Sequence, residues 1–454
     1  MPKKKTALTI EERLQQALVP AEEQPYEVPE NWVWVRLGSL YEVNPKNKAA
    51  DELDAAFIPM EKISAGMLSE YSYETQEWCK AKKGHTQFAD GDVAFAKISP
   101  CFENRKSMML NNLPNSIGGG TTELIILRNA SINQKYTFWL VSDERFIRGG
   151  VQTYSGTVGQ QRINMDYVRS YPVPLPPLSE QQRIVERIEE LFAKLDEAKE
   201  RLQEVADSFA VRKAAILHKA FTGELTKQWR RENGVSDESW EESNFGKFTV
   251  SQYGYTEKAH WEKIGPKFLR ITDIQDNKVD WDEVPWCPID EDGMKQYAVE
   301  IGDIMIARTG ATTGKSYLIC DDVEAVFASF LIRLKVVNKN LDYNYLYGYM
   351  QSEDYWRQIT DFSSGIAQPG VNASKLKQIK FKCPTLPEQH EIVRLIDDLL
   401  ARERKAQQAT EQALASIDLM KKSILARAFR GELGTNKASE ASALELLRQV
   451  LAEN

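Results

Sequence analysis

Hydrophobic and polar residues follow two distinct patterns along this chain, and each pattern occurs twice. Short apolar runs bounded by Gly, Pro, Asn and Asp fill residues 41–178 and again 244–385, which is typical of β-strands. Residues 179–234 and 386–434 instead place apolar side chains at every third or fourth position, as a helix does. The pattern therefore predicts two mixed α+β domains, each followed by a long helix.

Both long helices carry a heptad-like seam, which predicts that they pack on each other. The first fits a capping box at Ser179 and Gln182, and the helices are expected to end at Gly223 and Gly431. An antiparallel pair would place the two domains at opposite ends, related by a pseudo-twofold axis. The first seam comprises Ile184, Ile188, Leu191, Leu195, Ala198, Leu202, Val205 and Phe209, and the second comprises Ile392, Ile396, Leu399, Ala406, Ala413, Ile417, Met420 and Ile424.

The duplication is also visible residue by residue, as internal repeats should be. Residues 177–185 match 385–393, and 215–225 match 423–433, both at an offset of 208. Within the domains the offset is 211, and most of the intervening sequence is unalike. At that offset Gly91-Asp92 matches Gly302-Asp303, and Lys97 matches Arg308. The expected organisation is an N-terminal arm (1–40), a first domain (41–178), a spacer helix (179–234), an acidic linker (235–243), a second domain (244–385), a second spacer helix (386–434) and a C-terminal arm (435–454).

Composition narrows the class of protein. No stretch has the 18–20 apolar residues of a membrane span, and the N-terminus lacks the apolar core of a signal peptide, so a cytoplasmic protein is expected. The five cysteines form no CxxC pair and the four histidines are isolated, so no metal site is predicted. The net charge is −8, but residues 235–243 carry four acidic and no basic side chains. Residues 41–178 carry 15 basic and 15 acidic side chains, and 244–385 carry 17 and 19.

The segment Leu175-Pro-Pro-Leu-Ser-Glu-Gln-Gln-Arg-Ile-Val185 with its helix, and Ala220-Phe-Thr-Gly-Glu-Leu225, resemble the specificity subunit of type I restriction–modification systems. The second copies, Leu386–Val393 and Ala428–Leu433, strengthen the resemblance, and Gly91–Lys97 and Gly302–Gly310 look like that family's target-recognition domains. The resemblance covers about residues 40–434.

The resemblance implies a non-catalytic subunit with two different reading domains. Each domain would read one half of a bipartite double-stranded DNA sequence, and the paired helices would fix the spacing and dock two methyltransferase subunits. Restriction/translocase subunits would complete the complex. S-adenosylmethionine, ATP and Mg would belong to the partner subunits, so this chain itself is expected to hold no cofactor. The docking residues expected on the helices are Ile184, Ile188, Leu191, Leu195, Ile392, Ile396 and Leu399.

DNA contacts are expected in two loops of each domain, because Arg and Lys suit guanine edges, Asn and Gln suit adenine, and hydroxyl groups suit phosphates. The alternative for the cations is a solvated turn in which each pairs with a local carboxylate. The alternative for the second loop is a structural role, closing the domain onto its helix. The candidates are Lys97, Arg105, Lys106, Arg308, Thr309 and Lys315 in the first loops, and Gln160, Gln161, Arg162 and Gln368 in the second.

Other functions are disfavoured by what the motifs lack. Gly310–Ser316 imitates a phosphate-binding loop but has three residues, rather than four, before Gly-Lys-Ser. The one Pro-Pro pair, at 176–177, does not form the Asn/Asp-Pro-Pro-aromatic motif of an adenine methyltransferase. The remaining alternatives are a stand-alone nuclease or DNA modifier with duplicated domains, and a coiled-coil scaffold that does not bind DNA. Two terminal amphipathic helices, Thr9–Val19 and Ala441–Ala452, either pack on the body or grip a partner.

Overall fold

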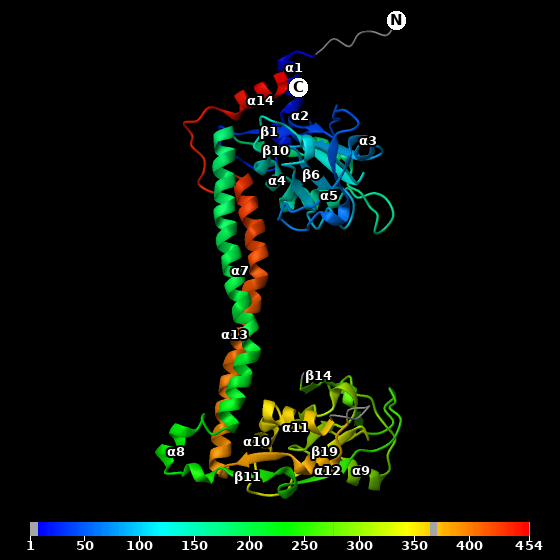
Figure 1. Ribbon diagram of the computed structural model, residues 1–454, viewed down its shortest axis with the longest axis vertical. Helices are drawn as coiled ribbons and strands as arrows, with labels where there is room; N and C mark the ends of the chain where they lie inside the picture. The colour runs from blue at the N-terminus through cyan, green and yellow to red at the C-terminus, as the bar shows by residue number, and fades with distance from the viewer. Residues whose placement is uncertain (1–7, 276, 364–369, 454) are drawn as a thin grey trace. The chain divides into compact units, whose positions relative to one another are not determined.

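The computed structural model describes residues 8–275, 277–363 and 370–453 (Figure 1). It divides into two compact units, one formed by Met1–Leu202 and Ala413–Asn454 and the other by Gln203–Gln412. The two long helices, α7 (Leu178–Phe221) and α13 (Leu386–Phe429), are each 44 residues long. Each helix begins in one unit and ends in the other, so each unit contains one α+β domain, called a head below, and parts of both helices.

The first head contains two four-stranded sheets, which are antiparallel except where β3 pairs with β8. A separate two-stranded ribbon closes the head where the chain enters and leaves it. The strands, in sheet order, are β2 (Glu42–Val43), β9 (Leu124–Arg128), β6 (Val93–Ala96) and β7 (Ser107–Met109); β4 (Glu74–Glu77), β3 (Asp54–Ile58), β8 (Ile117–Gly120) and β5 (Thr86–Ala89); and the ribbon β1 (Val33–Arg36) with β10 (Pro172–Leu175). The helices are α2 (Leu37–Leu40), α3 (Trp78–Ala81), α4 (Gln134–Ser142), α5 (Glu144–Val151) and α6 (Met165–Ser170).

The second head repeats this plan, as the tandem repeat predicts. Its main sheet has the order β12-β19-β16-β17, which corresponds to β2-β9-β6-β7 in the first head. The strands are β12 (Thr249–Tyr253), β19 (Leu331–Val336), β16 (Ile304–Ala307) and β17 (Ser316–Leu318), with the pairs β13 (Lys267–Leu269) and β18 (Ala325–Phe327), β14 (Ile274–Gln275) and β15 (Lys278–Val279), and β11 (Glu241–Asn244) and β20 (Lys380–Cys383). The helices are α8 (Lys227–Asn233), α9 (Glu291–Tyr297), α10 (Tyr343–Tyr349), α11 (Glu353–Ser363) and α12 (Ala373–Gln378).

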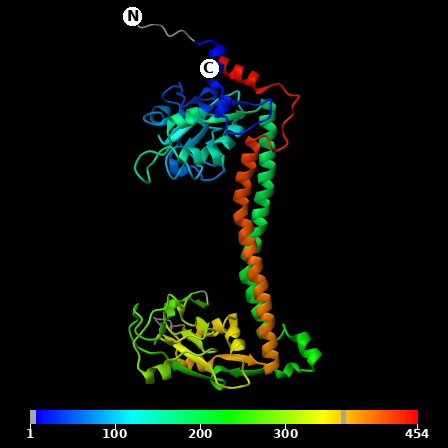
Figure 2. The same ribbon diagram turned by 180° about the vertical axis from the view of Figure 1, so that it is seen from behind.

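The first and last helices of the chain pack together in the first unit. Helices α1 (Ile10–Ala17) and α14 (Ala443–Glu453) lie side by side in both views (Figures 1 and 2), and the Arg13 guanidinium donates to the Leu451 carbonyl at 3.0 Å. Trp32 and Leu37 also belong to the core of this unit. The described part of residues 1–40 is therefore built into the first unit rather than forming a separate arm. Residues 241–243, expected as linker, likewise lie in strand β11 of the second unit.

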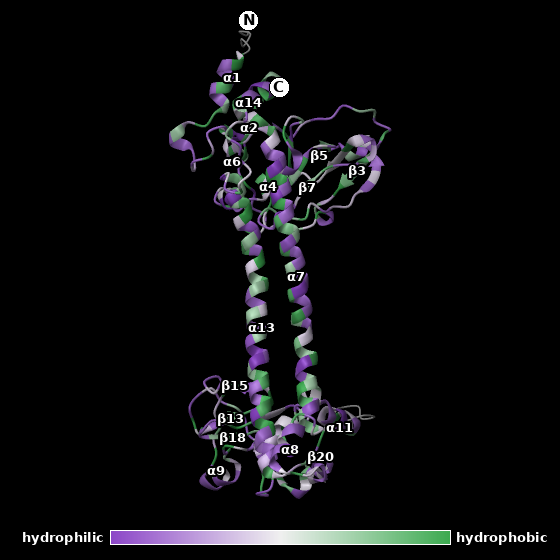
Figure 3. Ribbon diagram, turned by 90° about the vertical axis from the view of Figure 1, so that its left-hand side faces the viewer, coloured by the Kyte–Doolittle hydropathy of each residue, from purple (hydrophilic) through white to green (hydrophobic). Residues whose placement is uncertain are grey.

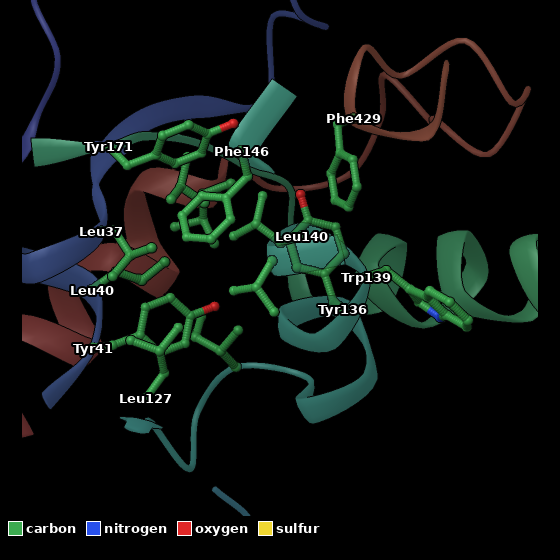
Figure 4. Packing of buried hydrophobic residues seen from close by; sticks show 14 of the residues in the cluster. Leu37, Leu40, Tyr41, Leu127, Tyr136, Trp139, Leu140, Phe146, Tyr171 and Phe429 are labelled. Carbon is green, nitrogen blue, oxygen red and sulfur yellow. The ribbon is translucent and has the colours of Figure 1, made fainter. Parts of the chain in front are cut away.

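The largest core of the first unit joins the head to the end of α13. Figure 4 shows Tyr41, Tyr136, Phe146 and Tyr171 gathered in this core, with Phe429 entering from the end of α13. The Phe429 ring meets the Tyr136 ring edge-on, with centroids 5.4 Å apart. Such pairs add roughly 0.5–1.5 kcal/mol beyond the apolar area that they bury.

The long helices pack antiparallel in each unit, as predicted. In the first unit the Lys421 ammonium lies 2.5 Å from the Asp196 carboxylate, and in the second the Arg212 guanidinium lies 2.8 Å from Glu403. Gly223 follows the end of α7 with a φ of 82°, and Gly431 does the same for α13 with a φ of 74°. These left-handed positions confirm the predicted helix ends.

Two details of the helix prediction are wrong. Helix α7 begins at Leu178, where the Pro177 carbonyl accepts the Gln181 N–H at 3.0 Å, so Ser179 lies inside the first turn and caps nothing. Val205 and Met420, placed in the seams, are 41% and 48% exposed. A straight helix has 3.6 residues per turn, so a strict 3.5-residue seam drifts out of the contact. Figure 3 shows apolar and polar segments alternating along both helices.

Candidate nucleic-acid interface and its anchorage

The two candidate loops of the first head lie against each other. Ile98 forms an antiparallel bridge with Arg162, and the Ser99 N–H donates to the Gln161 carbonyl at 2.8 Å. The Ile163 N–H donates to the Lys97 carbonyl at 3.0 Å. The strand exit that carries Lys97 and the loop that carries Gln160 to Arg162 therefore form one surface.

Within this surface Arg162 is bound to a carboxylate. Its Nε and Nη2 donate to Glu123 at 2.9 and 2.8 Å, and its Nη1 donates to the Gln160 carbonyl at 2.8 Å. The hydrogen bonds from Arg162 hold the pKa of Glu123 below its usual value, and the positive charge of Lys97 acts in the same direction. The Gln160 side chain is exposed, while Lys97 and Gln161 are partly buried.

Arg105 and Lys106 point into the protein. Arg105 is 12% exposed, pairs with Glu144 and donates from Nε to the Ser142 carbonyl at 3.0 Å. Glu144 also lies 3.2 Å from the Lys422 ammonium of α13. The Lys106 ammonium donates to the Met60 carbonyl at 2.9 Å. These contacts favour the local-pairing alternative for Arg105 and a structural contact for Lys106.

The second head reproduces the same backbone arrangement. The Arg308 N–H donates to the Phe330 carbonyl at 3.2 Å, just as the Lys97 N–H donates to the Glu123 carbonyl at 2.8 Å. The Val371 N–H donates to the Arg308 carbonyl at 2.9 Å, and Thr309 forms a bridge with Gly370. Gln368, the remaining candidate here, lies outside the described residues.

The side chains on this arrangement differ from those of the first head. The Arg308 guanidinium lies 5.0 Å from the centre of the Tyr253 ring and donates to the Ser329 carbonyl at 3.2 Å. Within the described part of the chain it pairs with no carboxylate. Lys315 is exposed and Thr309 is partly buried. Where the first head has Glu123, the second has Phe330, whose side chain is 59% exposed.

Glu123, Tyr253 and Phe330 were missed by the sequence reasoning. Phe330 heads the apolar run that was interpreted as a strand, and Glu123 lies in a similar run. For Glu123 and Phe330 the available signal is position, because each directly precedes a strand of the main sheet and the two correspond in the repeat.

Each head is anchored to the start of its long helix by a Glu-Gln pair, here called the clamp, formed by Glu180-Gln181 and by Glu388-Gln389. Gln181 accepts the Asn133 N–H at 3.0 Å and donates to the Pro176 carbonyl at 3.0 Å. Gln389 accepts the Asp342 N–H and donates to the Pro384 carbonyl, both at 2.8 Å. Asn133 and Asp342 cap α4 and α10, so each glutamine ties a head helix to a long helix.

The glutamate of each clamp accepts hydrogen bonds from the segment that follows the other long helix, and Glu180 also accepts one from the segment before β1. Glu180 accepts the Trp32 indole N–H at 2.7 Å and the Asn436 amide at 2.9 Å. Glu388 accepts Trp240 at 3.0 Å, Arg230 at 2.7 Å and Thr226 at 2.6 Å. Both carboxylates are fully buried. The duplicated sequence motif thus corresponds to a duplicated anchorage.

A family model described as the type I restriction modification DNA specificity domain matches residues 29–207 and, a second time, residues 238–413. These two matches span more than half of the chain. The chain belongs to this specificity family. Its heads are the family's two target-recognition domains, and it is a specificity component rather than the catalytic part of a restriction–modification enzyme.

Individual relatives agree with the family assignment. The chain is 27% identical over 472 residues to the type I restriction enzyme EcoAI specificity subunit of Escherichia coli, covering 84% of this chain and 80% of the relative. It is 36% identical over 182 residues to the EcoEI specificity subunit of Escherichia coli, covering 39% and 31%. The crystal structure of the HsdS subunit from Thermoanaerobacter tengcongensis matches with a TM-score of 0.68 at 19% identity, covering 90% of this chain and 99% of that one. This last likeness confirms the fold.

The structure places the docking candidates of this specificity chain mostly inside it. Ile184 and Ile188 are buried in the core of the first unit, and Ile392 and Ile396 in that of the second. Leu191, Leu195 and Leu399 are partly buried. The four isoleucines therefore contribute to the chain's own packing.

In the part of the chain that the structure describes, no helix is both long and apolar enough to cross a membrane. All five cysteines are free thiols. Among the same described residues, no cluster of three His, Cys, Asp or Glu side chains could hold a metal ion.

Proposed function

We propose that this chain is the DNA-recognition and assembly subunit of a cytoplasmic type I restriction–modification complex. It reads an asymmetric bipartite sequence in double-stranded DNA with its two heads. The observation that carries the proposal is the shared backbone arrangement at Lys97 and Arg308, which bears Glu123 and Arg162 in one head but Phe330 and an Arg308 that lies on Tyr253 in the other. One scaffold with different chemistry suits the reading of two different half-sites.

The proposed contacts divide by exposure. Gln160 and Lys315 are exposed, so they are the first candidates for direct contact with DNA. Lys97, Gln161, Arg162, Arg308 and Thr309 lie on the same surfaces of their heads, and Gln368 would join them from the second loop. Arg105 and Lys106 would act behind the surface by holding the loop from Ile98 to Ser107. Phosphate contacts would fix the register, and base contacts would select the sequence.

Methyltransferase docking is proposed on the exposed faces of the helices, since the buried seam is occupied. Val211 on α7 is 69% exposed and Leu419 on α13 is 66% exposed, so both apolar side chains are accessible to a partner. Two methyltransferase subunits would bind along the helices, and restriction/translocase subunits would join the complex. The partner subunits would bind S-adenosylmethionine, ATP and Mg.

The docking proposal is tested by introducing a charge at these positions. Val211→Asp and Leu419→Asp should each reduce co-purification of methyltransferase subunits with the full chain, because each buries a carboxylate in an apolar contact. Ser423→Asp changes another exposed position of α13 and is the control. Undiminished co-purification of both variants would contradict docking at these residues.

The reading function is tested by exchanging one head. Replacing residues 41–178 with the corresponding domain of a relative, in cells that contain the whole complex, should change one half of the methylated motif in genomic DNA and leave the other half intact. Replacing 244–385 is the reciprocal control and should change the other half. Changes in both halves, or in neither, would contradict the two-headed model.

The purified chain and the head-exchange variants also distinguish the two alternatives, a stand-alone enzyme and a scaffold that does not bind DNA. A stand-alone enzyme would cleave or modify DNA as the purified chain without partners. A scaffold that does not bind DNA would leave the methylation pattern unchanged when either head is exchanged. Binding dominated by phosphate contacts must weaken with salt, whereas a scaffold shows no such dependence.

A further inference from the structure

Phe330 presents an apolar ring to solvent from a fixed backbone. Its neighbours Ala328 and Leu331 are 7% and 0% exposed, but its own side chain is 59% exposed. The Phe330 carbonyl accepts the Arg308 N–H at 3.2 Å. On either side of Phe330, the Leu331 N–H donates to the Ala328 carbonyl at 2.9 Å, and the Ser329 N–H donates to the Tyr255 carbonyl at 2.8 Å. The ring is therefore held outward by a hydrogen-bonded turn rather than by a loose loop.

The surroundings of Phe330 are cationic and aromatic. The Arg308 guanidinium rests near the Tyr253 ring and donates to the carbonyl of Ser329, the residue before Phe330. The Tyr253 hydroxyl in turn accepts the Ala373 N–H at 3.2 Å. Neither Arg308 nor Lys315 forms an ion pair with a carboxylate in the described ranges. An unpaired cation beside an exposed ring attracts a polyanion and offers it an apolar contact.

The first head lacks this combination. At the position of Phe330 it has Glu123, which binds Arg162 through both carboxylate oxygens. Trp261 in the second head is more exposed, at 66%, but the guanidinium stacked on it, that of Arg270, is bound to Asp273. Phe330 therefore differs from both, because the Arg308 guanidinium near it binds a carbonyl and an aromatic ring and, within the described ranges, no carboxylate.

In the major groove, an apolar side chain recognises the 5-methyl group of thymine, and an Arg recognises guanine O6 and N7. We propose that Phe330 contacts a thymine methyl group in the half-site read by the second head, and that this contact makes it a specificity-determining residue. The inference rests on the proposed function, because it assigns one base contact to one of the two heads.

The test removes the thymine methyl group and the Phe330 ring, first separately and then together. Replacing a thymine by uracil deletes only its methyl group and keeps the pairing with adenine. The half-site is first identified by mapping the methylated motif. The dissociation constant of the full complex is then measured on duplexes in which each recognised thymine of both half-sites is replaced in turn.

One uracil substitution in the second half-site should weaken wild-type binding about fourfold. This corresponds to the roughly 0.8 kcal/mol gained when one methylene-sized group is buried. Phe330→Ala should bind the thymine duplex more weakly and lose sensitivity to that same substitution. Phe330→Leu, which keeps an apolar side chain at this position, should retain part of the sensitivity to the uracil substitution. Trp261→Ala is the matched control, since it removes another exposed aromatic side chain of the same head and should keep the full thymine preference.

The outcomes separate this inference from the function beneath it. If the motif is bipartite but Phe330→Ala keeps the wild-type response to every uracil substitution, the Phe330 contact is wrong and the reading function stands. A second half-site without any recognised T·A pair also overturns the contact. If no bipartite motif depends on this chain, the proposed function itself fails, and the contact fails with it.

Discussion

Asp92 and Asp303 show what the repeated Gly-Asp pair does. Asp92 accepts the Ala89 N–H and both Nε and Nη2 of Arg128, all at 2.7 Å. Asp303 accepts the Glu300 N–H at 3.0 Å and Arg333 at 3.3 Å. The preceding glycines have φ values of 86° and 91°, which other residues rarely adopt. The pair closes a turn and anchors the neighbouring strand, so its recurrence marks the fold of the head rather than the site.

Asp92→Asn should therefore lower stability without changing the recognised sequence. The variant loses a charged, nearly buried pair with Arg128, so we expect the free energy of unfolding to fall by about 2 kcal/mol. Thermal unfolding of the full chain would measure the change, with Asp54→Asn, at an exposed position, as the control. An altered methylation motif in the Asp92→Asn variant would contradict a purely structural role.

The sequence indicated candidate residues for the site, but it did not indicate the side chains with which they pair. Lys97 and Arg308 were found because they recur at equivalent positions. The pairing of Arg105 with Glu144 and of Arg162 with Glu123 joins residues 39 positions apart, as the separations of these hydrogen bonds show. No local pattern reports such a pairing, so the choice between a DNA contact and a local ion pair needed the structure.

At the scale of elements, Glu388 of the clamp ties the start of α13 to the segment between α7 and β11. Arg230→Ala removes one partner of the fully buried Glu388 carboxylate, and breaking a buried pair typically costs 3–5 kcal/mol. Because Thr226 and Trp240 still bind Glu388, we expect a loss of about 3 kcal/mol. Urea unfolding of the second unit, followed by tryptophan fluorescence, would measure it.

Arg231→Ala is the matched control for this change, because Arg231 is the adjacent arginine and is exposed. Equal stability of the two variants would show that the hydrogen bonds of the clamp contribute little beyond the packing around them.

The terminal helices give a second prediction at this scale. Leu447 of α14 is fully buried in the core of the first unit. Leu447→Ala should lower the free energy of unfolding by about 3 kcal/mol, as large-to-small core changes do, and Gln449→Ala on the exposed side should not. The measurement is the melting temperature of the full chain. A neutral Leu447→Ala would leave α14 free for the alternative role of gripping a partner.

Elements were easier to predict than their assembly. The apolar runs at 92–96 and 303–307 became β6 and β16 within one residue, because periodicity is a local property. The ribbon β1-β10 joins Val33 to Leu175, and no spacing in the sequence indicates that pairing. Residues 1–40 were therefore expected as an arm, although part of them closes the first head.

At the scale of the whole molecule, the two heads are near neutral, so under the proposed function DNA binding would depend on local cations. If Lys315 contacts a phosphate, Lys315→Ala should weaken binding to all sequences alike and reduce the slope of log K against log salt concentration by about 0.9. Lys339→Ala removes another exposed charge of the second head, outside the candidate loops in the sequence, and is the control. Measuring the binding constant of the complex at several salt concentrations gives this slope. An unchanged slope in the Lys315→Ala variant would show that Lys315 contacts no DNA phosphate.

The clamp also has a consequence for the exchange of heads between related proteins. Gln181 and Gln389 hold their heads through a main-chain N–H and a carbonyl, groups that almost every residue type supplies. Mutations that alter the reading surface therefore leave the attachment untouched, and a foreign head inserted between β1 and α7 meets the same attachment point. Under the proposed function, exchanging one head by recombination would change one half of the recognised sequence while the other head and both long helices stay the same.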